Sequence, residues 1–148
     1  MNQIKEKTAA ALQQLIAEDS YLLVQDVNER SISHKLAGYL EQRFEGWDVD
    51  CEYNRNHDDP KRLNIPRKET QSNDTHATTV FPDIIVHRRH TDQNLLVIEI
   101  NKSTNRFGDD YDLQKLEKFK QELGYQYAVF IKLRAGNGEA EVQRMQWL

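Results

Sequence analysis

A chain of 148 residues can bury the core of one domain, so we interpret residues 1–148 as a single domain. Its net charge of −4 argues against a protein that coats nucleic acid by bulk attraction, although a local basic groove beside an acidic metal site stays compatible with it. One cysteine excludes an internal disulfide, and no apolar run near the N-terminus is long enough for a signal peptide or membrane helix, so we expect a cytoplasmic protein without a membrane partner.

The first 54 residues predict two helices and one strand. Residues 3–18 carry apolar side chains at helical spacing, which predicts an amphipathic helix added to the core. Residues 21–27 form a short apolar segment that fits either a strand or a loop. A second helix is predicted over residues 28–44, and residues 47–54 alternate apolar and polar side chains, as a half-buried strand does.

Residues 55–79 have no apolar period and are rich in Asn, Asp, His, Thr and basic residues, which predicts a long polar loop. If it is a substrate loop, its cations would contact phosphates. Acidic residues nearly cancel this charge, so a loop that only aids solubility is an equal alternative. The cations in question are Lys61, Arg62, Arg67 and Lys68.

Residues 80–103 are the predicted centre of the fold. Two apolar runs, 80–86 and 95–100, flank a polar turn, which predicts a hairpin of central strands covered on both faces. The first run carries Asp83 and the second carries Glu99. Burying a carboxylate in such a strand costs free energy, so we expect each acid to have a specific role. The hairpin can bring the two acids close enough to share a divalent metal such as Mg²⁺.

Beyond the hairpin, we predict a helix over residues 110–123, a strand over 127–133 and a closing strand over 140–147. The resulting fold class is α+β, with a mixed sheet flanked by helices. Arg88 and Arg89, at the end of the hairpin, are a further candidate for contacts with a nucleic-acid backbone, with an ordinary surface turn as the alternative.

Pro82 and Asp83, followed after fifteen residues by Glu99 with a lysine nearby, resemble the PD-(D/E)xK motif of restriction-endonuclease-like nucleases. In that motif the lysine stands two residues after the second acid, where this chain has Asn101. The resemblance implies a restriction-endonuclease-like core over about residues 28–133. It also implies hydrolysis of phosphodiester bonds in DNA, or in RNA, with Mg²⁺ or Mn²⁺, and it allows a homodimer, since related enzymes that cut both strands often dimerise.

The resemblance also implies roles for individual residues. Asp83 and Glu99 would hold the metal, and Glu29 is nominated as a further ligand because related nucleases often take one from the preceding helix. The alternative for Glu29 is a capping box with Asp26. Glu52 is a fourth candidate ligand, with a solvated strand face as its alternative.

A water-positioning role falls to Asn101, Lys102 or Lys115. Alternation places Asn101 on the face of Glu99, and Lys102 on the opposite face. Lys115 is considered because related nucleases move the lysine function to a neighbouring helix, and its alternative is an ordinary surface lysine.

Two other interpretations stay open. In one, the fold is a catalytically degenerate nuclease that serves as a nucleic-acid-binding or protein-binding module, with Asn101 marking the lost chemistry. In the other, Asp83 and Glu99 are structural and pair with buried basic groups such as Lys102 or Arg88.

Overall fold

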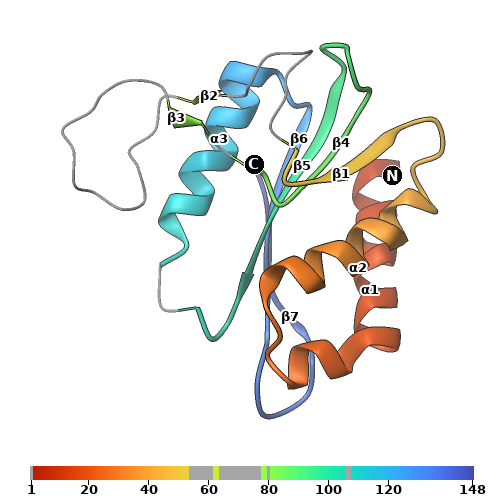
Figure 1. Ribbon diagram of the computed structural model, residues 1–148, viewed down its shortest axis with the longest axis vertical. Helices are drawn as coiled ribbons and strands as arrows, with labels where there is room; N and C mark the ends of the chain where they lie inside the picture. Colours follow the sequence, from red (N-terminus) through yellow and green to blue (C-terminus); the bar gives the residue numbers. More distant parts are fainter. Residues whose placement is uncertain (1, 54–61, 64–77, 80, 106–107) are drawn as a thin grey trace.

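The apolar runs of the sequence form a mixed sheet with helices on both of its faces (Figure 1). This computed structural model describes residues 2–53, 62–63, 78–79, 81–105 and 108–148. Within them no helix is both long and apolar enough to cross a membrane. The helices are α1 (Gln3–Val24), α2 (Glu29–Glu41) and α3 (Asp110–Leu123). The strands are β1 (Asp48–Cys51), β2 (Arg62–Leu63), β3 (Thr78–Thr79), β4 (Ile84–His87), β5 (Asn94–Lys102), β6 (Tyr127–Leu133) and β7 (Val142–Trp147).

The predicted hairpin is at the centre of the sheet, whose strand order is β1-β4-β5-β6-β7. β4 pairs antiparallel with both β1 and β5, and β7 pairs antiparallel with β6. β5 and β6 are parallel, which requires a crossover connection, and α3 supplies it. The α+β class with a mixed sheet is therefore confirmed.

The two faces of the sheet are covered by different helices. Side chains at alternate positions of β5, such as Ile98 and Ile100, join the apolar core that contains α1 and α2. Val97 points the other way and packs with Leu116 and Phe119 of α3. The continuous apolar character of β5 thus reflects burial on both faces, as predicted.

The N-terminal part of the chain differs from the prediction in two respects. α1 continues to Val24 across a kink at Asp19, so residues 21–24 belong neither to a strand nor to a loop. Leu23 is buried in the core, whereas Tyr21 and Val24 are exposed. At α2, the side chain of Asn28 accepts the N–H of Ser31 at 3.0 Å, so Asn28 caps the helix and the alternative capping box of Asp26 with Glu29 is not formed.

Several strand boundaries also differ. β1 stops at Cys51 because the next residue, Glu52, adopts a left-handed backbone conformation with φ of 50°. β4 begins at Ile84, later than expected, whereas β5 extends from Asn94 to Lys102. The polar segment 55–79 contains the two short strands β2 and β3, which pair antiparallel beside α3 (Figure 1).

An ionic cluster joins β1 to the end of β4. The buried ring of His87 lies 2.6 Å from Asp50, and Arg89 donates to the same carboxylate through Nε at 3.0 Å. Burial alone would raise the pKa of Asp50, but the hydrogen bonds from His87 and Arg89 outweigh it and lower this pKa to about 2. The charged form of Asp50 therefore stabilises the pairing of β1 with β4.

We predict that Asp50→Asn lowers the free energy of unfolding by about 2 kcal/mol at neutral pH. Because the folded pKa lies below the ordinary value of 3.8, this stabilisation is complete above about pH 4 and is lost as the pH falls toward about 2. Urea denaturation of both proteins across this range should show their difference shrinking. Exposed Glu45, changed to Gln, is the control, and a difference that does not vary with pH would contradict the prediction.

Candidate functional site

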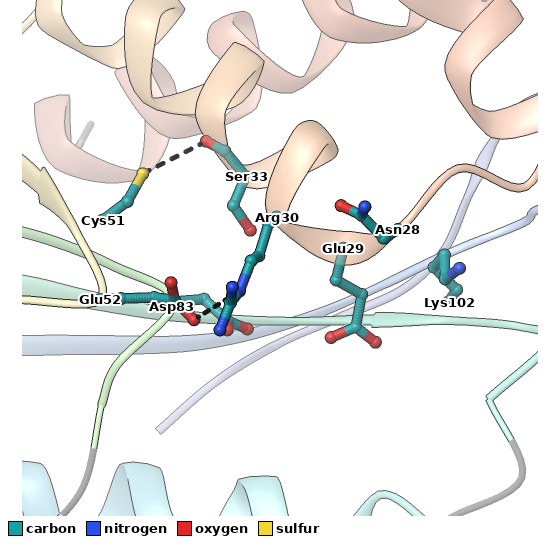
Figure 2. A pocket seen from close by; sticks show the side chains of 8 residues that line it. All are labelled: Asn28, Glu29, Arg30, Ser33, Cys51, Glu52, Asp83 and Lys102. Carbon is teal, nitrogen blue, oxygen red and sulfur yellow. Dashed lines mark hydrogen bonds and ion pairs between the residues drawn. The ribbon is translucent and has the colours of Figure 1, made fainter.

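A pocket of about 590 Å³ opens between the start of α2, the end of β1 and the central hairpin (Figure 2). Glu29 and Arg30 extend from the first turn of α2 toward the sheet, and Lys102 lies at one end of the pocket. The pocket therefore gathers acids and cations from three separate elements. Its lining consists of Asn28, Glu29, Arg30, Ser33, Cys51, Glu52, Asp83 and Lys102.

Asp83 and Glu99, predicted to meet across the hairpin, are joined by a hydrogen bond. The backbone N–H of Asp83 donates to Glu99 Oε2 at 2.8 Å. The carboxylate of Asp83 in turn accepts the N–H of Ile100 through Oδ2 at 2.7 Å. Asp83 is half-buried and lines the pocket, whereas Glu99 is 2% exposed and lies on the α3 side of the sheet. The two acids are thus adjacent, but they face different layers.

Lys115 of α3 is the cation of this arrangement. Its Nζ donates to Glu99 Oε1 at 2.7 Å and to the carbonyl oxygen of Phe81 at 2.6 Å. Lys115 is buried, so it is not the ordinary surface lysine of the alternative interpretation. Burial would lower its pKa, but the negative charges of Glu99 and Asp83 outweigh burial and raise it. Lys115 therefore remains charged and compensates Glu99.

The electrostatics of Asp83 differ from those of an exposed carboxylate. Burial is the largest cause that raises the pKa of Asp83 well above its usual range, and the charge of Glu99 adds to it. Lys115 and the N–H of Ile100 oppose the shift without cancelling it, and Glu29 raises the pKa further. Burial and the neighbouring carboxylates therefore disfavour the charged form of Asp83 more than Lys115 and the N–H of Ile100 favour it.

Asn101 belongs to a second polar cluster on the α3 side. Its Nδ2 donates to Asp109 at 3.1 Å, and Asp109 also accepts from Lys132 at 3.3 Å and from Arg144 at 2.9 Å. The Oδ1 of Asn101 is buried without a hydrogen-bond partner among the described residues. Asp109 is the N-cap residue of α3, but its side chain makes no capping hydrogen bond to that helix. The polar end of Asn101 is therefore held by Asp109.

Lys102 faces the opposite layer, as strand alternation predicts. Its Nζ donates to Asp26 Oδ1 and to the carbonyl oxygen of Val27, both at 2.9 Å. Thr104 donates to the same Asp26 oxygen, so this network holds the connection between α1 and α2 against the end of β5. Lys102 lines the pocket, but its ion pair is with Asp26. The structural interpretation had suggested a pair with Asp83 or Glu99 instead.

Glu29 and Glu52, the two other predicted acids, both line the pocket. Glu29 accepts from Asn105 at 3.4 Å. Glu52 pairs with Arg30 at 3.3 Å, and its backbone N–H donates to the carbonyl oxygen of Asp83 at 3.2 Å. The structure therefore brings both residues to the pocket that Asp83 lines.

Arg88 and Arg89, two of the predicted phosphate-contacting cations, lie outside the pocket lining. Arg88 stacks on Trp47 at 4.0 Å, and Arg89 pairs with Asp50, so both make local contacts at the far end of β4. The side chain of Arg62 and the whole of Lys61, Arg67 and Lys68 lie outside the described residues. The sequence analysis did not select Arg30 as a site residue. Its position next to Glu29 in the first turn of α2 could have indicated that it lies beside the predicted acids. The sequence analysis also missed Asp109 as the partner of Asn101.

The donor chemistry suits a hard cation with few protein ligands. Within the described residues, no group of three or more His, Cys, Asp and Glu side chains lies close enough to hold a metal ion. Mg²⁺, however, usually takes only one or two protein carboxylates and keeps several waters. Asp83 Oδ1 makes no hydrogen bond within the described part of the chain and belongs to a residue that lines the pocket. Asp83 therefore offers an open carboxylate oxygen to such a cation, whereas both oxygens of the adjacent Glu99 already accept hydrogen bonds.

No model of a known protein family matches the chain, and no curated protein or solved structure is significantly similar to it.

The buried pair of Glu99 and Lys115 gives a first prediction for this site. Lys115→Met leaves the Glu99 carboxylate buried without a cation, and we expect a loss of about 3 kcal/mol in unfolding free energy. The double variant Glu99→Gln with Lys115→Met should lose less than the sum of the single losses, because no unpaired charge remains.

Urea denaturation of the four proteins measures this coupling. The matched control is Lys118→Met, which removes one partner of the more exposed pair between Lys118 and Glu122 and should change stability by less than about 0.5 kcal/mol. Additive losses in the Glu99 and Lys115 variants would show that the pair is not coupled.

Proposed function

We propose that this chain is a metal-dependent phosphodiesterase with a restriction-endonuclease-like core that cuts nucleic acid, with DNA as the first candidate. The observation that supports this proposal is the hydrogen-bonded chain from Asp83 through Glu99 to Lys115. It combines two acids from the central hairpin with a cation from the neighbouring helix. The relocated lysine suggested by the motif is thus within hydrogen-bond distance of the second acid.

Asp83, Glu99 and Glu29 are the residues that would hold Mg²⁺ or Mn²⁺. When bound, the ion lowers the pKa of a water and neutralises charge on a phosphate. Burial, followed by the charge of Glu99, disfavours the charged form of Asp83, and a bound divalent cation would favour that form.

Lys115 would orient the reacting groups from the α3 side. An ammonium group has three N–H donors, and two of them are used by Glu99 and by the carbonyl oxygen of Phe81. No contact within the described residues uses the third, which in this proposal binds a water molecule or a phosphate oxygen. Because the first two contacts fix the side chain, that donor needs little reorganisation to stabilise developing negative charge.

Cleavage assays test this proposal directly. We expect the purified protein to cut plasmid or single-stranded DNA, or RNA, with Mg²⁺ or Mn²⁺ but not with EDTA. Asp83→Asn should lower the rate by about 100-fold or more, because it removes the charge that faces the pocket. Calorimetric titration with Mn²⁺ should show weaker binding by the same variant.

Asp92, an exposed acid in the hairpin turn, provides the control: Asp92→Asn should cut and bind Mn²⁺ as the natural chain does. Metal binding that is unchanged by Asp83→Asn would refute the proposed metal site. A folded protein that cuts no substrate in any metal would refute the enzymatic function.

The second candidate is a degenerate nuclease that only binds nucleic acid or protein. This candidate is favoured by Asn101, which is 1% exposed. Its amide donates to Asp109 and not to Asp83 or Glu99. In addition, Glu99 already accepts from both Lys115 and the N–H of Asp83. If these contacts of Glu99 are retained when a ligand binds, its charge stabilises the fold and takes no part in catalysis.

Asn101→Lys separates the two candidates. If the chain is a degenerate enzyme, restoring the lysine should create metal-dependent cleavage that the natural chain lacks. If Lys115 already supplies the cation, the substitution should change the rate little or lower it, because the new ammonium approaches Lys132 and Arg144. Cleavage rates of both proteins, with Asp83→Asn added to each as a control, decide the question.

A further inference from the structure

Arg30 is a cation in the candidate pocket that neither the motif nor the proposed chemistry uses. It lies in the first turn of α2, lines the pocket with Asp83, and has a side chain that is 81% exposed. Figure 2 shows it reaching from the helix toward the sheet, where Nε lies 3.3 Å from Glu52 Oε1. Its position differs from that of Lys102, whose side chain is 15% exposed and held by Asp26.

The pocket creates an electrostatic problem for a phosphodiester substrate. Three acids line it, namely Glu29, Glu52 and Asp83, and an approaching phosphate is repelled by each of them. Of the two cations in the described lining, Lys102 already compensates Asp26. The exposed guanidinium of Arg30 is therefore the strongest attraction for an arriving phosphate, because it offers several N–H donors in one plane.

The contact between Arg30 and Glu52 is suited to exchange. Both side chains are well exposed, at 81% and 42%, and such ion pairs contribute little to stability, so their separation is easy. Glu52 is nevertheless held at a defined position, because its backbone is left-handed and its N–H donates to the carbonyl oxygen of Asp83 at 3.2 Å. A carboxylate at this position occupies Arg30 until another anion replaces it.

We propose that Arg30 binds a backbone phosphate of the nucleic-acid substrate in this pocket, and that Glu52 is the internal anion which that phosphate displaces. The inference rests on the proposed function, since it identifies how the substrate of that site is recognised. Arg30 acts here as a binding and positioning residue, and the reacting groups remain Asp83, Glu99 and Lys115.

The test measures binding separately from cleavage. A fluorescein-labelled single strand of roughly 12 nucleotides, and the matching duplex, are titrated with protein in Ca²⁺, and gels verify that the DNA stays intact. Arg30→Ala should weaken binding about 10-fold, and the salt dependence of log K should lose about one phosphate contact. Arg30→Lys should recover part of the loss, because it keeps the charge but not the fork.

Glu52→Gln gives the opposite expectation. Removing the competing anion should tighten binding about 3-fold in the natural background. If Glu52 acts through Arg30, the gain should disappear in the double variant with Arg30→Ala. A gain that persists there would mean that Glu52 only repels DNA at long range, and it would overturn the displacement step.

Lys35→Ala is the matched control, since it removes an exposed cation from the same helix outside this pocket. Equal losses for Arg30→Ala and Lys35→Ala, or the absence of any DNA binding by the natural chain, would overturn the inference. If Asp83→Asn abolishes cutting while Arg30→Ala binds normally, only this inference fails. If the binding effects appear but nothing is cut, only the proposed catalytic function fails.

Discussion

The buried ion pair between Glu99 and Lys115 is the interaction on which the central hairpin and its acids depend. A carboxylate that is 2% exposed in a central strand would be strongly destabilising without a cation, and α3 supplies that cation. The same ammonium binds the carbonyl oxygen of Phe81, just before β4. One charge therefore joins a helix, a strand and the segment that leads to Asp83. The position of Asp83 is consequently set by buried polar contacts as well as by packing.

The sheet separates the charged groups of the site into two layers. Glu99 and Lys115 lie on the α3 side, whereas Glu29, Arg30 and Glu52 line the pocket beside α2. Asp83 connects the layers, because its backbone N–H binds Glu99 and its carboxylate belongs to the pocket lining. A ligand in the pocket would thus lie next to the one residue that contacts both layers, and the pKa of this residue is raised first by burial and then by Glu99.

Local patterns predicted the elements well where tertiary contacts agree with them. The helix over 110–123 and the strand over 127–133 have the predicted bounds, because their apolar periods are clear and Gly124, with φ of 68°, ends the helix. Residues 21–24 were misjudged because burial of Leu23 extends α1 beyond the regular part of its pattern. The adjacency of Asp83 and Glu99 followed from hairpin geometry and alternation. The partners of Lys115 and Arg30 did not, since no sequence period encodes which distant side chain a long, flexible cation reaches.

The neighbours of Asn101 explain why an amide suits this position. Lys132 and Arg144 already share Asp109, so a lysine at this position would add a third cation to one carboxylate, whereas the amide of Asn101 donates without adding charge. Meanwhile Glu99 receives its cation from α3, a source that does not depend on the alternation of β5. The ammonium beside the acids therefore does not require a lysine in β5. Under the proposed function, an enzyme and a binding module would differ in whether Lys115, fixed by Glu99 and Phe81, offers a third N–H to a substrate.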